Sequence, residues 1–80
     1  MKVPRNLSSE RLIQLLANFG YETTRQTGSH IRLTTQANGQ HHLTIPAHDP
    51  LKIGTLNSIL RSVGEHFSLT KDEVLEKIFS

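Results

Sequence analysis

The fold is decided by residues 30–45, which read HIRLTTQANGQHHLTI. Apolar and polar side chains alternate on both sides of the Asn38-Gly39 dipeptide, and this alternation is typical of strands that bury one face. Asn-Gly between two such stretches is a strong signal for a tight turn. The sequence therefore predicts an antiparallel β-hairpin centred on this dipeptide.

The register of the hairpin follows from the requirement that both strands share one apolar face. A two-residue loop would put the two apolar faces on opposite sides. A three-residue loop at residues 37–39, with Gly39 left-handed, puts them on the same side, and we expect this register. It pairs Leu33 with Leu43 and Ile31 with Ile45 on the core face, and Arg32 with Thr44, Thr34 with His42 and His30 with Pro46 on the outer face.

A helix and a further strand are predicted upstream of the hairpin. Ser8 is placed to cap the helix and Gly20 to end it. The apolar residues between them have helical spacing: Leu12, Leu15, Leu16 and Phe19. Residues 21–26 are rich in β-forming residues and lead into a turn at 27–29, so we expect a three-stranded meander after the helix.

Two helices are predicted downstream of the hairpin. Thr55 is placed to cap the first and Gly64 to end it, and Thr70 with Glu73 forms a capping box for the second. The apolar residues of the two helices are Leu56, Ile59, Leu60 and Val63, then Val74, Leu75, Ile78 and Phe79. We predict one α+β domain over residues 1–80, α-β-β-β-α-α, with the helices on one face of a three-stranded antiparallel sheet.

The charge of the chain is unevenly distributed. Residues 1–61 carry seven Lys or Arg against three acids, whereas residues 62–80 carry two against four. A basic body favours an anionic partner such as nucleic acid, although an ordinary solubilising surface explains the same charges. The chain has no cysteine and no run of roughly 20 apolar residues, so we expect a cytoplasmic protein without a membrane span.

The outer face of the predicted sheet carries side chains suited to RNA chemistry. His30 lies beside Arg32 there, with Thr34 and His42 on the same face. Imidazole can move a proton at a ribose hydroxyl, and guanidinium can stabilise charge on a phosphate. Gly28, just before the strand, would let a phosphate approach closely. A solvated strand after a turn glycine is the alternative interpretation of these residues.

Two other groups of residues carry side chains of the types that bind anions or metals. Lys52 and Thr55 at a helix start offer free amides and a positive dipole to an anion, although a plain helix cap is the alternative. His41, adjacent to His42, is not expected to join it in a metal site, because neighbouring strand residues point to opposite faces. His66 lies after the expected helix end, so neither it nor His41 is assigned a role.

Several short motifs in this order resemble a known family. They are Gly28-Ser29-His30 at the start of a strand, then Leu43-Thr44-Ile45-Pro46-Ala47-His48, then Gly54-Thr55-Leu56 with Ile59-Leu60-Arg61 and Gly64. Over about residues 12–79 the chain resembles the HicA (YcfA-like) toxins. The resemblance implies a fold like the double-stranded-RNA-binding domain (dsRBD), mRNA interferase activity in a type II toxin-antitoxin system, and neutralisation by a HicB antitoxin.

By position, the resemblance implies that His30 is the catalytic residue and that Gly28 is needed for activity. We predict a metal-independent endoribonuclease without a cofactor, in which Arg32 and Lys52 hold phosphates. The further candidate RNA-binding residues are Ser29 and Thr55, and the candidate neighbours of the site are His42 and His48. Two alternatives stay open, a non-catalytic RNA-binding module of the same fold and a protein that only docks on an antitoxin.

Overall fold

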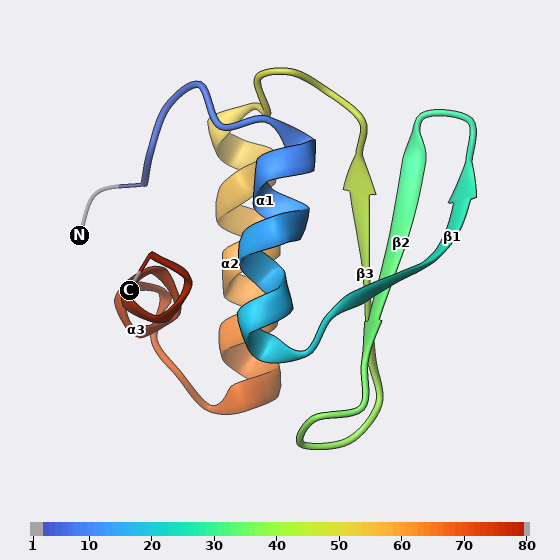
Figure 1. Ribbon diagram of the computed structural model, residues 1–80. Helices are drawn as coiled ribbons and strands as arrows, with labels where there is room; N and C mark the ends of the chain where they lie inside the picture. The colour runs from blue at the N-terminus through green and yellow to red at the C-terminus, as the bar shows by residue number, and fades with distance from the viewer. Residues whose placement is uncertain (1–2, 80) are drawn as a thin grey trace.

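The computed structural model describes residues 3–79, so Lys2, one of the basic residues counted above, lies outside the described part of the chain. Its elements are α1 (Ser9–Leu16), a 3-10 turn η1 (Ala17–Phe19), β1 (Glu22–Thr27), β2 (His30–Thr35), β3 (His41–Pro46), α2 (Ile53–Phe67) and α3 (Lys71–Ile78). The strands form an antiparallel sheet in the order β1-β2-β3, and the helices lie on one side of it (Figure 1). The predicted α+β class and element order are confirmed, and the arrangement is consistent with a dsRBD-like fold.

The β2–β3 hairpin has the predicted register. Asn38 and Gly39 have φ angles of 56° and 95°, the left-handed conformation that these two residue types tolerate best. The pairs are His30 with Pro46, Ile31 with Ile45, Arg32 with Thr44, Leu33 with Leu43, Thr34 with His42 and Thr35 with His41. The apolar members of these pairs therefore face the helices, and Arg32 and His42 face away from them.

β1 is an edge strand whose side chains are all exposed, which explains why its sequence shows no apolar face. It joins β2 through a two-residue turn that begins at Gly28, whose φ of +56° glycine adopts without strain. A β-bulge between Thr23 and Arg25 inserts Thr24 as an extra residue in the ladder. The bulge changes which side chains of β1 share a face beyond Arg25, whereas the pairing of Arg25 with Arg32 follows from the two-residue turn between Thr27 and His30.

The hydrophobic core lies between the helices and the inner face of the sheet. Fully burying one such aliphatic side chain contributes roughly 1.5–3 kcal/mol, so this layer is the main source of stability. The apolar residues with no more than 1% of their surface exposed are Leu12, Leu16, Leu33, Ile45, Leu56, Leu60, Val63, Val74, Leu75 and Ile78. The prediction is wrong for Phe79, which follows the last turn of α3 and is 40% exposed. The buried Tyr21 was missed because no alternation marks it.

α2 begins earlier than predicted. Its first hydrogen bond runs from Leu56 N to Lys52 O (2.9 Å), so the N-cap is Lys52, and Thr55 lies within the first turn without capping the helix. The chain is fixed just before the helix by the buried Leu51, whose N donates to Leu7 O at 2.8 Å. Because this anchor stands next to Lys52, the helix starts there.

α2 also continues past Gly64, which does not end it. The helix runs to Phe67 and ends at Ser68, which has the left-handed conformation. A Cβ added to Gly64 would lie 2.6 Å from the carbonyl oxygen of Leu69, so glycine is required here because the returning chain crosses the helix closely. The pattern that predicts a helix end therefore reflects a tight contact instead.

The other predicted helix ends are confirmed. Arg11 N donates to Ser8 Oγ at 3.1 Å, and Thr70 forms both hydrogen bonds of a capping box with Glu73. Gly20, with φ of 83°, ends the 3-10 turn that extends α1. Local sequence rules thus work where a cap is made by neighbours in the chain.

Candidate functional site on the open sheet face

A hollow of about 270 Å³ lies on the sheet face that points away from the helices. It is lined by Arg25, Thr27, His30, Arg32, His42 and Thr44. The structure thus brings together three of the predicted site residues, His30, Arg32 and His42. Arg25 and Thr44 join them, although the sequence analysis assigned neither to a site.

Arg25 and Arg32 face each other across β1 and β2, and both are exposed. Like charges directly opposite one another on neighbouring strands are destabilising. Among the described residues, those that line the hollow include no carboxylate to neutralise the pair. Two guanidinium groups held together in this way suit an anion such as phosphate, which each can bind through two parallel hydrogen bonds.

His30 begins the central strand and is exposed. Its side chain has no hydrogen-bond partner within residues 3–79. The turn before it needs glycine at position 28 for its conformation alone, because a Cβ on Gly28 would meet no atom within 4 Å. An exposed imidazole with no internal partner is free to exchange a proton with a bound molecule.

His42 is held by a chain of side-chain hydrogen bonds. Its Nδ1 lies 2.8 Å from Thr34 Oγ1, which lies 2.8 Å from Thr24 Oγ1. The Thr24 hydroxyl in turn donates to the carbonyl oxygen of Arg32 at 3.4 Å. This chain fixes the orientation of the imidazole, while its Nε2 has no hydrogen-bond partner among the described residues.

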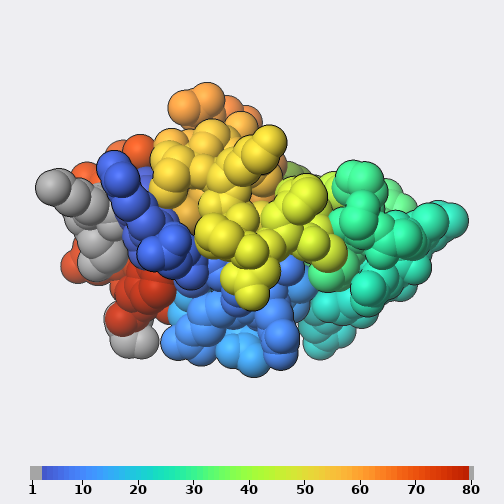
Figure 2. Space-filling model, turned by 90° about the horizontal axis from the view of Figure 1, so that it is seen from above, coloured from blue at the N-terminus to red at the C-terminus, as the bar shows by residue number. Residues whose placement is uncertain are grey.

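The remaining predicted residues lie toward the end of the sheet where β1 turns into β2. Ala47 N donates to Ser29 O at 2.6 Å, which joins the link after β3 to this turn; Figure 2 shows the yellow link beside the green turn. His48 and Lys52 are exposed in this link, and Thr55 is half-buried in the first turn of α2. The structure does not bring these three side chains into the hollow.

A second histidine pair lies on the other side of the sheet. The rings of His41 and His66 stack with their centroids 4.4 Å apart and their planes at 10°. His41 also contacts Tyr21 Oη through Nδ1 (2.7 Å) and Ser62 Oγ through Nε2 (3.4 Å). The pair was not predicted, because a helix that ended at Gly64 would leave His66 outside it, whereas α2 continues to Phe67 and carries His66 to the start of β3.

Burial shifts the pKa of His41 and that of Tyr21, whose hydroxyl contacts it. It lowers the pKa of His41, and the charges of His66 and His42 lower that pKa further. Burial also raises the pKa of Tyr21 to about 12, so its phenol is neutral at pH 7. His66 Nε2 lies 2.9 and 3.0 Å from two carbonyl oxygens of the 37–39 loop, which only accept, so this nitrogen carries a proton. The second pair therefore fastens the hairpin loop to α2.

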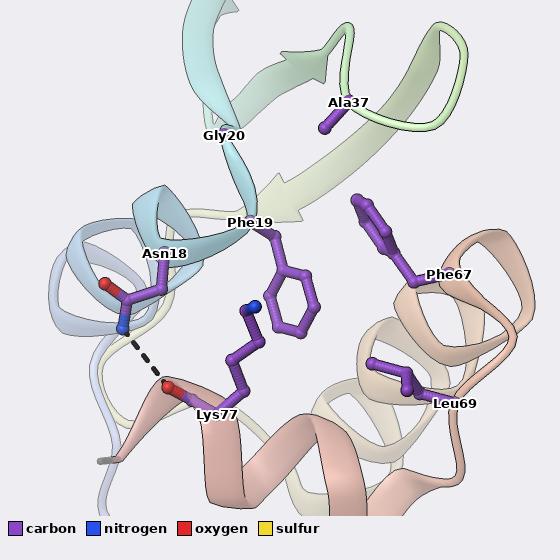
Figure 3. Close-up of a pocket in the computed structure, with 7 residues that line it drawn as sticks. All are labelled: Asn18, Phe19, Gly20, Ala37, Phe67, Leu69 and Lys77. Atoms are coloured by element: carbon purple, nitrogen blue, oxygen red, sulfur yellow. Dashed lines mark hydrogen bonds between the residues drawn. The ribbon is translucent and has the colours of Figure 1, made fainter.

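A further hollow of about 440 Å³ lies between η1, the 37–39 loop and the end of α2 (Figure 3). Phe19, Phe67 and Leu69 supply apolar walls, and Lys77 Nζ lies 5.3 Å from the centre of the Phe19 ring. Asn18 closes one side by donating to the Lys77 carbonyl at 3.5 Å. The described residues that line this hollow include no histidine or carboxylate, so they form no acid–base pair and the open sheet face remains the candidate site.

Comparison with protein families gave a match over residues 9–65 to the family described as the HicA toxin of bacterial toxin-antitoxin systems. This span includes every residue that lines the hollow on the open sheet face. Comparisons with curated proteins and with solved structures gave no match. Within residues 3–79, no helix is both long and apolar enough to cross a bilayer.

Proposed function

The chain belongs to the HicA toxin family of bacterial toxin-antitoxin systems, and from this premise we propose that it is an endoribonuclease that cleaves mRNA with His30. One observation carries the proposal. An unpartnered imidazole and a pair of unneutralised guanidinium groups, those of Arg25 and Arg32, share one hollow within the matched span. These are the groups that proton transfer and phosphate binding require.

The proposed reaction uses the 2′-hydroxyl of the RNA as the nucleophile. The bond from the 2′-oxygen to phosphorus forms and the bond from phosphorus to the 5′-oxygen breaks, leaving a 2′,3′-cyclic phosphate and a 5′-hydroxyl. One proton leaves the 2′-hydroxyl and one reaches the 5′-oxygen, and His30 serves one of these transfers. Because the nucleophile is part of the substrate, the step needs neither water nor metal.

Arg25 and Arg32 take the electrostatic part of the mechanism. Charge on the non-bridging phosphate oxygens grows as the fifth bond to phosphorus forms. Guanidinium groups fixed at that place stabilise the transition state more than the ground state, which is what raises the rate. The mutual repulsion of Arg25 and Arg32 in the free protein is relieved when a phosphate lies between them.

The candidate RNA contacts extend beyond the hollow. Gly28 and Ser29 form the turn next to His30, and the 2.6 Å bond to the Ser29 carbonyl holds the link that leads to Lys52 and Thr55 against this turn. An RNA strand that leaves the hollow past the turn would bring its next phosphates toward Lys52. We propose these four residues, with His48 beside them, as contacts to the RNA backbone.

Membership of a toxin family implies a toxin-antitoxin partner, and we propose that this partner is a HicB-like antitoxin acting in the cytoplasm. The same basic sheet face also supports a second function, RNA binding without cleavage. The two functions differ in one property, because binding alone leaves the RNA intact whatever residue stands at position 30.

The test compares the purified chain with its His30→Ala variant on a labelled mRNA transcript, with and without EDTA. We expect wild-type cleavage that EDTA does not stop and a loss of roughly 10²- to 10⁴-fold in the variant. Cleavage that survives His30→Ala, or that stops with EDTA, would contradict the mechanism. Salt-dependent binding with no cut products from either protein would favour the RNA-binding module. Growth arrest on induced expression, compared for both proteins, reports the same difference in cells.

A further inference from the structure

The transfer of two protons in the proposed reaction raises the question of a second acid–base group. The attacking and leaving oxygens lie roughly in line on opposite sides of the phosphorus. The base and the acid must therefore approach from opposite sides of the bound phosphate. A single histidine beside the phosphate cannot serve both oxygens in one step.

The register of the sheet places such a second group. Successive outer-face positions are two residues, or roughly 7 Å, apart along a strand. His30 occupies one row, Arg32 with Thr44 the next, and His42 the row after that. His30 and His42 thus flank the row that carries the guanidinium pair, and both line the same hollow.

The hydrogen-bond chain behind His42 defines which ring nitrogen can act. We assign the one proton of the Thr24 hydroxyl to the carbonyl oxygen of Arg32, which can only accept, so towards Thr34 the Thr24 hydroxyl accepts. The Thr34 hydroxyl then donates its proton to Thr24 Oγ1, and it therefore accepts a hydrogen bond from His42 Nδ1. Neutral His42 then carries its proton on Nδ1 and has the lone pair on Nε2, the form that a general base requires.

We propose that His42 is a second catalytic residue, the general base for the 2′-hydroxyl, and that His30 is the general acid for the 5′-oxygen. This inference rests on the proposed function. In the step, His42 Nε2 takes the 2′-proton as the 2′-oxygen bonds to phosphorus, and protonated His30 gives its proton to the departing 5′-oxygen. His42 ends protonated and His30 neutral, and exchange with water restores both. Thr34 and Thr24 are positioning residues.

The groups that face His42 come from every strand of the sheet. β2 contributes Arg32, and β1 contributes Arg25 together with Glu22, which pairs with Thr34 in the row of His42. On the other side of β3 stands His41, whose pKa the charge of His42 lowers. Neither these groups nor His30, which lines the same hollow, changes between the wild-type chain and the His42 and Thr34 variants below, so differences in their pH profiles report on the exchanged residue.

The test measures kcat/KM against pH for the full chain and for His42→Asn. Asparagine keeps a donor close to the position of Nδ1 for Thr34 Oγ1 but lacks Nε2, so a merely structural role would survive the exchange. We expect a bell-shaped profile for the wild type. The variant is expected to lose roughly 10²- to 10⁴-fold and the limb on the acidic side, where a base must be deprotonated.

A second substrate separates the acid from the base. In an RNA with sulfur in place of the scissile 5′-oxygen, the thiolate leaves without being protonated. His30→Ala should recover to within about tenfold of the wild type on this RNA, as expected for loss of a general acid alone. His42→Asn should not recover. Recovery of His42→Asn instead would overturn the assignment of base and acid.

The positioning role of Thr34 is tested with Thr34→Val, Thr34→Ser and the matched control Thr23→Val, which removes a hydroxyl from the adjacent strand at a position opposite Leu33. We expect Thr34→Val to displace the acidic limb of the profile, Thr34→Ser to restore it and Thr23→Val to leave it in place. Cleavage that depends on His30 but is unchanged in His42→Asn would overturn this inference alone, whereas no cleavage by the wild type would overturn the proposed function as well.

Discussion

Two pairs of histidines occupy opposite faces of one sheet, and their surroundings differ. On the helix side, His41 contacts Tyr21 and Ser62 and stacks on His66, whose Nε2 donates to two carbonyl oxygens. On the open face, His30 has no hydrogen-bond partner within residues 3–79 and His42 uses only Nδ1. Nitrogens that bind the protein's own atoms hold the structure together, while unengaged nitrogens are available to a ligand.

The comparison is sharpest at His41 and His42, which are neighbours in the chain. Strand alternation turns one ring toward the helices and the other toward solvent. Burial then lowers the pKa of His41, which favours the neutral form of the ring that stacks on His66. Whether a histidine of β3 stabilises the fold or is available to a ligand thus depends on the face of the sheet to which strand alternation turns it.

The largest effect is expected for His30→Ala on the open face, which should change RNA cleavage and leave the stability of the fold nearly unchanged. His30→Ala should lower the rate of RNA cleavage by roughly 10²- to 10⁴-fold, because it removes a proton-transfer group. The free energy of unfolding should change by no more than about 0.5 kcal/mol, because the side chain is exposed and unbonded. Urea denaturation and cleavage assays on the same preparation measure both. A large fall in the free energy of unfolding of His30→Ala would show that the open face also stabilises the fold, which would contradict the division between the two faces.

The converse is expected of His66→Ala. Two hydrogen bonds to the 37–39 loop and the stack on His41 disappear, so the free energy of unfolding should fall by roughly 1–3 kcal/mol. The rate per folded molecule should stay at the wild-type value. His48→Ala, which removes an exposed imidazole with no bond within residues 3–79, is the matched control for stability. Loss of activity in folded His66→Ala protein would contradict the division between the faces.

A smaller effect is expected at the arginine pair, where one exchange should raise the stability of the fold and weaken RNA binding. Arg25→Gln removes the repulsion from Arg32 and should raise the free energy of unfolding by roughly 0.2–1 kcal/mol. It should also weaken RNA binding and reduce the slope of log K against log salt by about 1, because one phosphate contact is lost. Arg61→Gln, an exposed exchange on α2, is the control. A loss of stability in Arg25→Gln would mean that the pair is not strained.

The smallest effect is the pH dependence of the free energy of unfolding that His41 contributes. The pKa of His41 is lower in the folded chain than the ordinary value of 6.5, so the unfolded chain takes up its proton first as the pH falls. Stability should therefore decrease as the pH falls below about 6.5 towards the folded pKa. His41→Asn keeps a polar partner for Tyr21 and cannot titrate, so its free energy of unfolding should depend less on pH in that range. An equal or steeper dependence in the variant would contradict the assignment.

The open face was predictable because parity and the loop length are local properties of the sequence. Two hydrophobic residues on each strand sufficed to turn His30, Arg32 and His42 to the same side. Arg25 was not predicted, because every side chain of β1 is exposed and no apolar alternation sets the register of this strand; its place opposite Arg32 follows from the two-residue turn between Thr27 and His30. The site was therefore predicted with its imidazoles but with only one of its two guanidinium groups.

The inner pair was missed for a different physical reason. Glycine near the end of a helical pattern usually ends the helix, but Gly64 instead allows the carbonyl of Leu69 to approach α2. This requirement comes from the turn after the helix, in which Leu69 folds back onto Gly64 and donates to its carbonyl oxygen at 2.8 Å. The spacing of apolar residues does not show where that turn begins. The missing turn of helix is the one that carries His66 to His41.

The central claim, that His30 on the open face cleaves RNA through its own 2′-hydroxyl, is tested most directly by the chemistry of the product ends. The wild-type chain is incubated with a synthetic RNA in excess EDTA and the fragments are analysed by mass spectrometry. The account predicts 2′,3′-cyclic phosphate and 5′-hydroxyl ends, absent with His30→Ala. Fragments with 3′-hydroxyl and 5′-phosphate ends, which require attack by water, would contradict it.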